Sequence, residues 1–302
     1  APTPEPEAMP ELARALAPQR CRVDPVSGQR CDWYHGLWQD LRRVGIAASA
    51  SRQRSLFSAG LMAALLTGSA APARPRVLVS GAADHAIYAE VLAACAGCGV
   101  DPDVTVIDVC ETPLCLCQAY AGAVRRTVVT TRADVFAYQP TERFDVICSH
   151  SFAGLFAPER RRQLFARWAD MLAPSGALLV VNRVRDTDPT RSVGFGEASS
   201  VSLCEQLDER LRRLQVSTAV REQALAYAAI YVRRLAIYPL SEGEIGALIG
   251  AAGLSIVHQA RTTSGDEQNA ACSGVAVAAN ATHACLVGHK APALGASAVT
   301  AT

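Results

Sequence analysis

Hydrophobic and polar positions alternate, from residue 76 onward, between short β-branched runs and longer helical patterns. We expect strands over 76–80, 104–108, 126–130, 145–148 and 177–183, with helices over 85–97, 112–123 and 157–172. Such alternation predicts a parallel sheet with right-handed crossovers. Two closing strands, 254–259 and 273–287, form a hairpin and complete a seven-stranded, mostly parallel, doubly wound α/β sheet with a terminal antiparallel strand.

The segments outside this sheet predict a helical cap and a helical insertion. Residues 1–20 are rich in Pro and Ala, so we expect a flexible arm there, and a flexible tail over 291–302. Two helical patterns place a cap over 21–72, ahead of the sheet domain at 73–290. A polar, Gly-containing stretch followed by helical patterns makes 186–240 an inserted lid, because insertions of this length often cover a site.

Charge and hydropathy exclude several partner classes. Lys and Arg number 29 against 28 Asp and Glu, the net charge is +1, and no dense basic run occurs, which disfavours nucleic acid and anionic membranes as partners. No apolar run reaches the roughly 18–20 residues of a membrane span, and the N-terminus lacks signal-peptide features. We expect a cytoplasmic protein with a small-molecule substrate; its cap could also support a homodimer.

The segment 75–111 contains a strand, a glycine turn, a helix, a second strand and a terminal acid. Gly81 ends the first strand, and Asp108 ends the second. In an α/β sheet the tip of the second strand lies beside the first turn, where a carboxylate can accept two hydrogen bonds from a ribose diol. This is half of a nucleotide-binding site.

Further motifs follow in order along the sheet. Ala133-Asp134-Val135 follows the third strand, Ser149-His150-Ser151 follows Phe144–Cys148, and MLAPSGALLVV enters the fifth strand. With these motifs, residues 75–289 resemble the class I S-adenosylmethionine-dependent methyltransferases. The resemblance implies S-adenosyl-L-methionine as cofactor, with Asp108 on the ribose and Asp134 on the adenine amino group. The implied cofactor-binding residues are Ser80, Gly81, Ala82, Asp84, Asp108, Val109, Asp134, Val135 and Ser149.

The first turn departs from the family pattern. Val79 stands where the family has an acid, and Ala83 and His85 stand where it has glycines; His85 adds bulk where backbone approaches the ligand. Asp84 supplies a carboxylate to the methionine ammonium or, alternatively, caps the helix over 85–97. The turn lacks G-x-G-x-x-G, which disfavours a dinucleotide dehydrogenase.

One histidine and a set of mostly aromatic residues are the candidates for chemistry on the substrate. His150 is the candidate base, because its ordinary pKa lets it accept a proton at neutral pH; the alternative is a satisfied structural histidine. The aromatic candidates could instead dock the cap onto the core. The candidate substrate-binding residues are Trp33, Tyr34, His35, Trp38, Asn182, Tyr227 and Tyr231.

The 11 cysteines are scattered, which suits reduced thiols better than a disulfide framework. Cys95 and Cys98 have C-x-x-C spacing but close a core helix, and we predict no metal among the site residues. Cys21 and Cys31 flank a turn-like segment and could bind metal or remain free thiols.

The predicted function is methyl transfer from S-adenosylmethionine to a heteroatom or carbon of a small metabolite, in a pocket between cap, lid and sheet edge. Two alternatives stay open. One is an enzyme that transfers or cyclises the aminocarboxypropyl arm of the same cofactor. The other is a non-catalytic binding protein on this fold.

Overall fold

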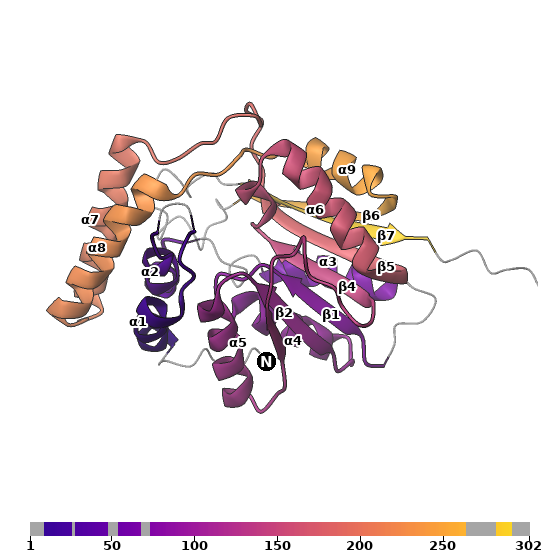
Figure 1. The fold of residues 1–302 in the computed structure, drawn as a ribbon, viewed down its shortest axis with the longest axis horizontal. Helices are drawn as coiled ribbons and strands as arrows, with labels where there is room; N and C mark the ends of the chain where they lie inside the picture. Colours follow the sequence, from indigo (N-terminus) through magenta and orange to yellow (C-terminus); the bar gives the residue numbers. More distant parts are fainter. Residues whose placement is uncertain (1–8, 26–27, 48–53, 68–72, 264–281, 292–302) are drawn as a thin grey trace, which may run out of the picture.

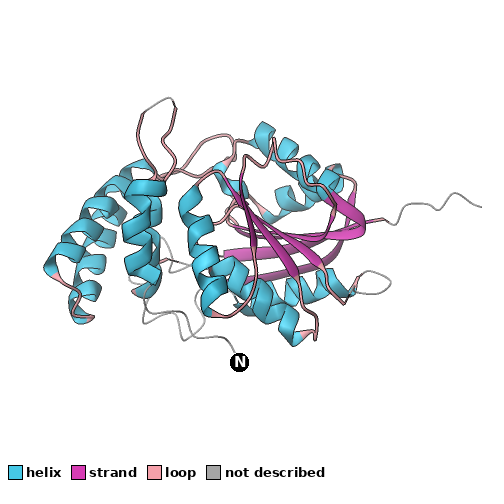
Figure 2. Ribbon diagram, turned by 60° about the horizontal axis from the view of Figure 1, so that its bottom comes forward, coloured by secondary structure: helices cyan, strands magenta, loops and turns pink. Residues whose placement is uncertain are grey.

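The computed structural model describes residues 9–25, 28–47, 54–67, 73–263 and 282–291 of the 302-residue chain. Its centre is a twisted seven-stranded sheet in the order β3-β2-β1-β4-β5-β7-β6, with helices on both faces (Figure 2). The strands are β1 (Arg76–Ser80), β2 (Asp103–Asp108), β3 (Val129–Arg132), β4 (Phe144–His150), β5 (Leu172–Arg183), β6 (Leu254–Thr263) and β7 (Thr282–Lys290).

The pairing of these strands confirms the predicted fold class. The pairs β1 with β2, β1 with β4, β2 with β3 and β4 with β5 are parallel, and β7 runs antiparallel between β5 and β6. β3 begins three residues later than predicted, at Val129 rather than 126. The last strand begins at Thr282, and the portion predicted over 273–281 lies outside the described residues.

Successive residues of β1 enter opposite hydrophobic layers. Val77 and Val79 of β1 pack beneath α3 (Arg54–Leu66), α4 (Ala86–Gly97) and α5 (Glu111–Ala123), as part of the larger core cluster. Leu78 enters the other layer, beneath α6 (Pro158–Met171) and α9 (Glu242–Ala251). β1 therefore buries residues on both faces of the sheet.

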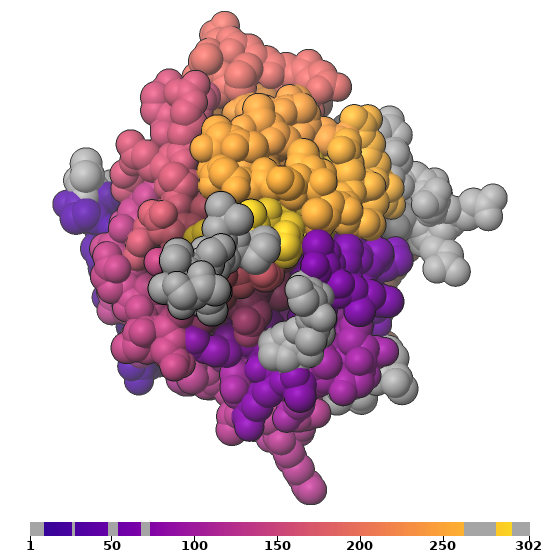
Figure 3. All heavy atoms as spheres, turned by 90° about the vertical axis from the view of Figure 1, so that its right-hand side faces the viewer, coloured from indigo at the N-terminus to yellow at the C-terminus, as the bar shows by residue number. Residues whose placement is uncertain are grey.

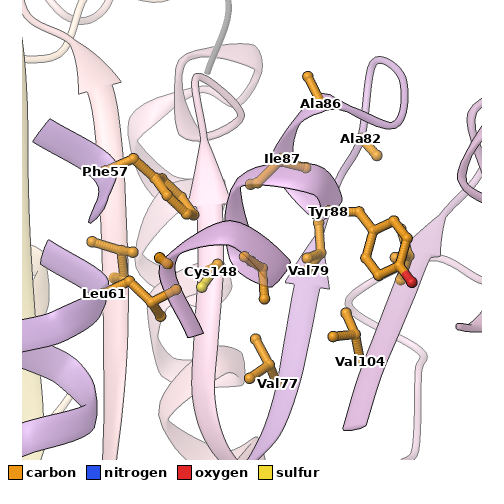
Figure 4. Packing of buried hydrophobic residues seen from close by; sticks show 14 of the residues in the cluster. Phe57, Leu61, Val77, Val79, Ala82, Ala86, Ile87, Tyr88, Val104 and Cys148 are labelled. Atoms are coloured by element: carbon orange, nitrogen blue, oxygen red, sulfur yellow. The ribbon is translucent and has the colours of Figure 1, made fainter. Parts of the chain in front are cut away.

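Helix α3 belongs to the sheet layer rather than to the cap in which it was predicted. Phe57 and Leu61 are fully buried and lie in the same cluster as Ile87 of α4 and Cys148 of β4 (Figure 4). Figure 3 shows α3 in violet beside the yellow β7, with the orange α9 and β6 above. The reason is hydrophobicity around the helix: α3 has no charged residue after Arg54 and needs a deep apolar contact.

The prediction of a flexible arm is wrong for residues 9–20, which form helix α1 (Met9–Arg20). Met9, Ala13 and Ala17 lie on one side of this helix and are buried. α1 packs on α2 (Asp32–Arg43) and on α5. Arg14 of α1 donates to Asp40 of α2 at 2.6 and 2.7 Å to the two carboxylate oxygens.

The cap consists of α2 with the inserted helices α7 (Glu197–Arg213) and α8 (Thr218–Arg234), which form a hydrophobic cluster of their own. Figure 1 shows α7 and α8 packed beside α1 and α2, at one end of the sheet. The predicted lid therefore packs directly onto the predicted cap. None of the described helices combines the length and hydropathy needed to span a membrane.

Candidate functional site

The turn after β1 and the tip of β2 meet as the sequence predicts. The Gly81 N–H donates to the Ile107 carbonyl at 3.0 Å, with the glycine at φ +78°. The Ala82 and Cys110 N–H groups donate to the two carboxylate oxygens of Asp108, at 3.0 and 2.7 Å. Burial raises the pKa of Asp108, and these two donors oppose the rise. The arrangement holds the Asp108 carboxylate against the glycine turn.

Helix α2 closes over this turn through Asp84. Oδ2 of Asp84 accepts hydrogen bonds from Gln39 at 2.8 Å and from Arg42 at 2.6 Å. Its Oδ1 accepts the N–H of Ala86, the first residue of α4, at 2.7 Å. Asp84 thus satisfies a donor at the start of α4, as the capping alternative expects, and also anchors α2.

The sequence led us to expect that His85 adds bulk on the ligand side of the glycine turn. In the structure it does not. Its ring is 1% exposed and stacks on Tyr120 of α5, with centroids 4.9 Å apart. The side chain therefore points into the core on the α4 and α5 side of the sheet, leaving the turn's outer face to Gly81, Ala82 and Asp84, which line a cavity.

This cavity has a volume of about 640 Å³ and extends from the glycine turn, beneath the cap, to the ends of β4 and β5. Ligand pockets of small molecules span roughly 300–1,000 Å³. Tyr34 lies between Trp38 and Tyr231, with its centroid 5.5 Å from the Trp38 ring and 6.1 Å from the Tyr231 ring, nearly parallel to both. Phe195 packs against Tyr231 at 5.6 Å. One wall of the cavity is therefore aromatic.

Another part of the lining carries polar side chains from the ends of adjacent strands. His150 is the last residue of β4 and pairs with Val181 of β5, while Arg183 ends β5 and pairs with His283 of β7. The rings of His150 and His283 stack with centroids 6.3 Å apart. Because β7 is antiparallel, its first residues return to the carboxyl edge, which brings His283 to the cavity.

Burial sets the charge state of this wall. It lowers the pKa of His150 to about 4, so the ring is neutral at pH 7. It also lowers the pKa of Arg183 to about 10, with a contribution from nearby Arg185, and both arginines keep their charge at neutral pH. Asn182 is 4% exposed, and its Oδ1 has no hydrogen-bond partner within the described residues. The wall therefore combines an unprotonated imidazole, an amide oxygen and cationic groups.

Solved structures share this architecture. The chain superposes on the [4+2]-cyclase SpnF with a TM-score of 0.54 and 14% identity, over 90% of this chain and 99% of that one. It matches 1,6-didemethyltoxoflavin-N1-methyltransferase from Burkholderia thailandensis with a TM-score of 0.52 and 19% identity, over 96% and 92% of the two chains. Magnesium protoporphyrin IX methyltransferase from Synechocystis gives 0.50 and 10%, over 96% and 100%. No protein-family model matches the sequence, and no curated protein matches it significantly.

The chain has the class I methyltransferase fold. At these identities the likeness shows the fold alone, and the cyclase among the neighbours illustrates that one fold hosts different chemistries. What this chain does is therefore argued from its own site residues.

Within the methyltransferase fold, most of the predicted site residues line the one cavity. On the side of the glycine turn these are Gly81, Ala82, Asp84, Asp108 and Val109. The others are Trp33, Tyr34, His35, Trp38, Asn182 and Tyr231, together with His150. The structure thus brings together segments that are separated by up to 200 residues, as the resemblance to this fold implies.

Five predicted residues do not line the cavity. Ser80 is fully buried and accepts a hydrogen bond from the Trp168 indole at 2.9 Å, and Ser149 donates to the Ser80 carbonyl at 3.3 Å. Val135 belongs to the core, and Asp134 is exposed, accepting the Phe136 N–H at 3.0 Å. Tyr227 covers Gly36 of α2 instead, where a Cβ would lie 2.7 Å from its ring. Its position favours the docking alternative.

Sequence reasoning missed several residues of the site. Arg183, Arg185, Phe195 and His283 line the cavity, and nothing in their local pattern marks them. Arg183 is at the carboxyl edge because it ends the strand predicted over 177–183, and His283 reaches the same edge through the antiparallel direction of β7. Cys110, two residues after Asp108 in the chain, also lines the cavity, and it lies in a cluster with Cys21, Cys31 and His35.

Proposed function

We propose that this protein binds S-adenosylmethionine at the glycine turn and transfers its methyl group to a small, flat, anionic molecule. The observation that carries the proposal is a single cavity that holds both halves of the required chemistry. The same cavity is lined by Gly81 and Asp108 and by His150 and Arg183. The resemblance of residues 75–289 to methyltransferases and the shared fold support the same conclusion.

The cofactor half rests on Asp108. Each of its carboxylate oxygens accepts one backbone N–H, and a carboxylate oxygen can accept a further hydrogen bond. Asp108 can therefore also accept the two hydroxyls of a ribose placed over the Gly81 turn. Ala82 and Val109 would flank the nucleoside. Asp134, which follows β3 one strand further along the edge, lies outside the cavity and accepts the Phe136 N–H.

The substrate half rests on the aromatic wall and the arginines. A planar substrate can stack in the space bordered by Trp38, Tyr34 and Phe195. Arg183 and Arg185 favour a carboxylate or phosphate on that substrate, because guanidinium groups match these anions in geometry and charge. The buried Oδ1 of Asn182 offers an acceptor to a hydroxyl or amine.

Methyl transfer requires alignment and removal of one proton. The substrate's oxygen or nitrogen attacks the methyl carbon, the carbon–sulfur bond breaks with its electron pair going to sulfur, and S-adenosylhomocysteine remains. Neutral His150 would take the proton from the acceptor atom. His283, stacked on its ring, would hold its orientation. Burial beneath the cap excludes water from the transfer.

Calorimetry with S-adenosylhomocysteine tests the cofactor half. We expect the wild type to bind it, and Asp108→Asn to bind it roughly 10- to 100-fold more weakly, because a charged acceptor of two hydroxyls is lost. Asp103→Asn is the matched control, since Asp103 begins the same strand at the opposite edge and pairs with Arg74. Absence of binding to the wild type, or equal loss in both variants, would refute the proposal.

Product analysis tests the reaction. The protein is incubated with S-adenosylmethionine and a panel of hydroxy- and aminobenzoates, and nucleoside products are separated by chromatography. Methyl transfer yields S-adenosylhomocysteine, and we expect His150→Gln to reduce its rate by about 100-fold or more. His289→Gln, at the other edge of the sheet, should leave the rate unchanged.

One observation favours a second candidate, transfer or cyclisation of the aminocarboxypropyl arm. Asp84, the predicted partner of the methionine ammonium, is occupied by Gln39, Arg42 and Ala86. The amino-acid arm would then be held differently from the family pattern. Methylthioadenosine in place of S-adenosylhomocysteine among the products would support this candidate against methyl transfer.

A further inference from the structure

We propose that Cys21, Cys31, His35 and Cys110 bind a single structural zinc ion between the cap and the cofactor strand. The ligand atoms of these four side chains all lie within 4.8 Å of one another. Three thiols and one imidazole form one of the usual ligand sets of structural zinc sites. This grouping is independent of the proposed methyl transfer.

The spacing of the sulfur atoms fits a metal better than a disulfide. Sγ of Cys31 lies 3.7 Å from Sγ of Cys110. Tetrahedral zinc with bonds of about 2.3 Å places two thiolate sulfurs about 3.8 Å apart, whereas a disulfide bond measures about 2.05 Å. All four positions of a tetrahedron are supplied by protein, so the ion would be structural and not a site for substrate.

The surroundings orient two of the ligands. The Nδ1 atom of His35 lies 3.1 Å from the Ala83 carbonyl oxygen. Because the carbonyl can only accept, Nδ1 carries the hydrogen, and Nε2 is left as the atom that binds the metal. Sγ of Cys21 lies 3.2 Å from the Thr112 hydroxyl, which can donate to a thiolate. Such outer hydrogen bonds accompany metal ligands in most zinc sites.

The local fold brings the three cysteines together. Cys21 directly follows α1, and Cys31 directly precedes α2. Between them the chain reverses: Val23 and Arg30 form an antiparallel bridge, and the Cys31 N–H donates to the Arg22 carbonyl at 3.2 Å. Cys110 arrives from the tip of β2, beside the cap.

Charge near the cluster also suits a thiolate-rich metal site. Three thiolates outweigh the charge of Zn²⁺, so a nearby cation stabilises the loaded site. Arg30 supplies one: its guanidinium donates to the Cys21 carbonyl at 3.0 Å. Cys21 and Cys110 are buried, which shields the ion from competing ligands in solvent.

The position of the site suggests what the ion stabilises. The Cys110 N–H donates to Asp108, and His35 contacts the carbonyl of Ala83 in the glycine turn. Zinc would therefore fix the cap, the turn and the ribose acid relative to one another. This consequence rests on the proposed function, whereas the metal site itself does not.

Metal analysis of the full-length protein, purified under reducing conditions without a metal-affinity column, tests the proposal. We expect about one zinc per chain in the wild type and less than about 0.2 in Cys31→Ser, because three ligands bind structural zinc poorly. Cys98→Ser is the matched control, since Cys98 lies at the end of α4 and outside the cluster. Its zinc content should equal that of the wild type.

A second measurement keeps the proposal testable if Cys31→Ser does not fold. Zinc is removed from the wild type with a chelator, and Co²⁺ or Zn²⁺ alone is added back. We expect thiolate-to-cobalt charge-transfer absorption, its loss on adding Zn²⁺, and a rise in Tm on the order of 10 °C with zinc. The S-adenosylhomocysteine titration is repeated on the zinc-free and the zinc-loaded protein. A difference in affinity between the two reports the effect of zinc on the cofactor site, separately from zinc binding itself.

Three outcomes would overturn the proposal. The first is a wild type that carries no zinc and shows no change in Tm or cobalt absorption on reconstitution. The second is zinc retained equally in Cys31→Ser and Cys98→Ser. The third is a disulfide among Cys21, Cys31 and Cys110, found by mass spectrometry of protein isolated with its thiols blocked.

Discussion

Arg42 of α2 and Asp84 of the glycine turn form a buried ion pair, with 2.6 Å between Nη1 and Oδ2 and side-chain exposures of 6% and 4%. Gln39 donates to the same oxygen from one turn earlier in α2. The carboxylate therefore joins the cap to the turn that carries Gly81. Removing one member of a buried pair is costly because the other charge stays buried without its partner.

We expect Arg42→Met to lower the free energy of unfolding by roughly 2–4 kcal/mol, measured by urea denaturation. Arg213→Met is the control, because Arg213 pairs with Glu209 on the surface of α7 with exposures of 73% and 52%. Exposed pairs contribute about 0–1 kcal/mol. Equal, small effects of the two substitutions would contradict the anchoring role of Asp84.

Gly81 has no tolerance for a side chain. Its φ is +78°, and a Cβ would lie 2.6 Å from Cε2 of Phe152. Gly81→Ala should therefore lower the free energy of unfolding by about 2–4 kcal/mol through backbone strain and overpacking, and displace Phe152 into the cavity.

Gly122→Ala provides the contrast for this substitution. Gly122 lies within α5, and nothing lies within 4 Å of the position its Cβ would take. There alanine should raise stability by about 0.5–1 kcal/mol, because it is the better helix former. Thermal unfolding of both variants checks the opposite signs, and a neutral Gly81→Ala would contradict the strained turn.

His150 gives stability a dependence on pH. Its pKa is about 4 in the folded protein and 6.5 in the unfolded chain, so between these values the unfolded chain binds more protons. Stability is unaffected by this group above pH 6.5 and falls as the pH is lowered toward 4, by at most about 3 kcal/mol. The groups facing the ring are Asp84, whose charge opposes the shift, the stacked His283, and Arg183 at the end of β5.

The measurement is urea denaturation between pH 4 and 7. His150→Gln should flatten the slope relative to the wild type, whereas His289→Gln at the opposite edge of the sheet should retain it. An unchanged slope in His150→Gln would show that the proton uptake belongs to another group.

Tyr231 holds the cap together through its ring. It is 6% exposed and packs against Tyr34, Trp33 and Phe195, with centroids 6.1, 6.2 and 5.6 Å away. We expect Tyr231→Ala to lower the free energy of unfolding by about 3–4 kcal/mol and Tyr231→Phe by less than about 1, because phenylalanine keeps the ring contacts. Denaturation of both variants separates ring packing from any contribution of the hydroxyl.

Much of the sheet could be predicted because the signal is local. β1, β2 and β4 are short apolar runs with polar or glycine ends. Such a run can be recognised as a buried strand without information about distant residues. α1 was missed because Pro10 and Pro18 lie within it and prolines usually interrupt helices. The helix is stabilised by the tertiary packing of Met9, Ala13 and Ala17. These contacts cannot be read from the local sequence.

The cavity was predicted in part for the same reason. Asp108 and His150 are the last residues of β2 and β4, and strand ends in a parallel sheet share one edge. His283 reaches that edge only through the antiparallel direction of β7, and Phe195 depends on how the insertion folds back over the sheet. Pairings across 100 residues leave no trace in the pattern of either partner.

By itself the sequence determined the order of strands and helices, the glycine turn and the acid at Asp108, because each depends on neighbouring residues. Only the tertiary structure decided that α3 lies on the sheet, that Asp84 anchors α2, and that Cys21, Cys31, His35 and Cys110 meet at one point. Hydrophobic periodicity indicates which side of a segment is buried, but it does not indicate which other segment covers that side. The covering segment depends on the packing of the whole chain.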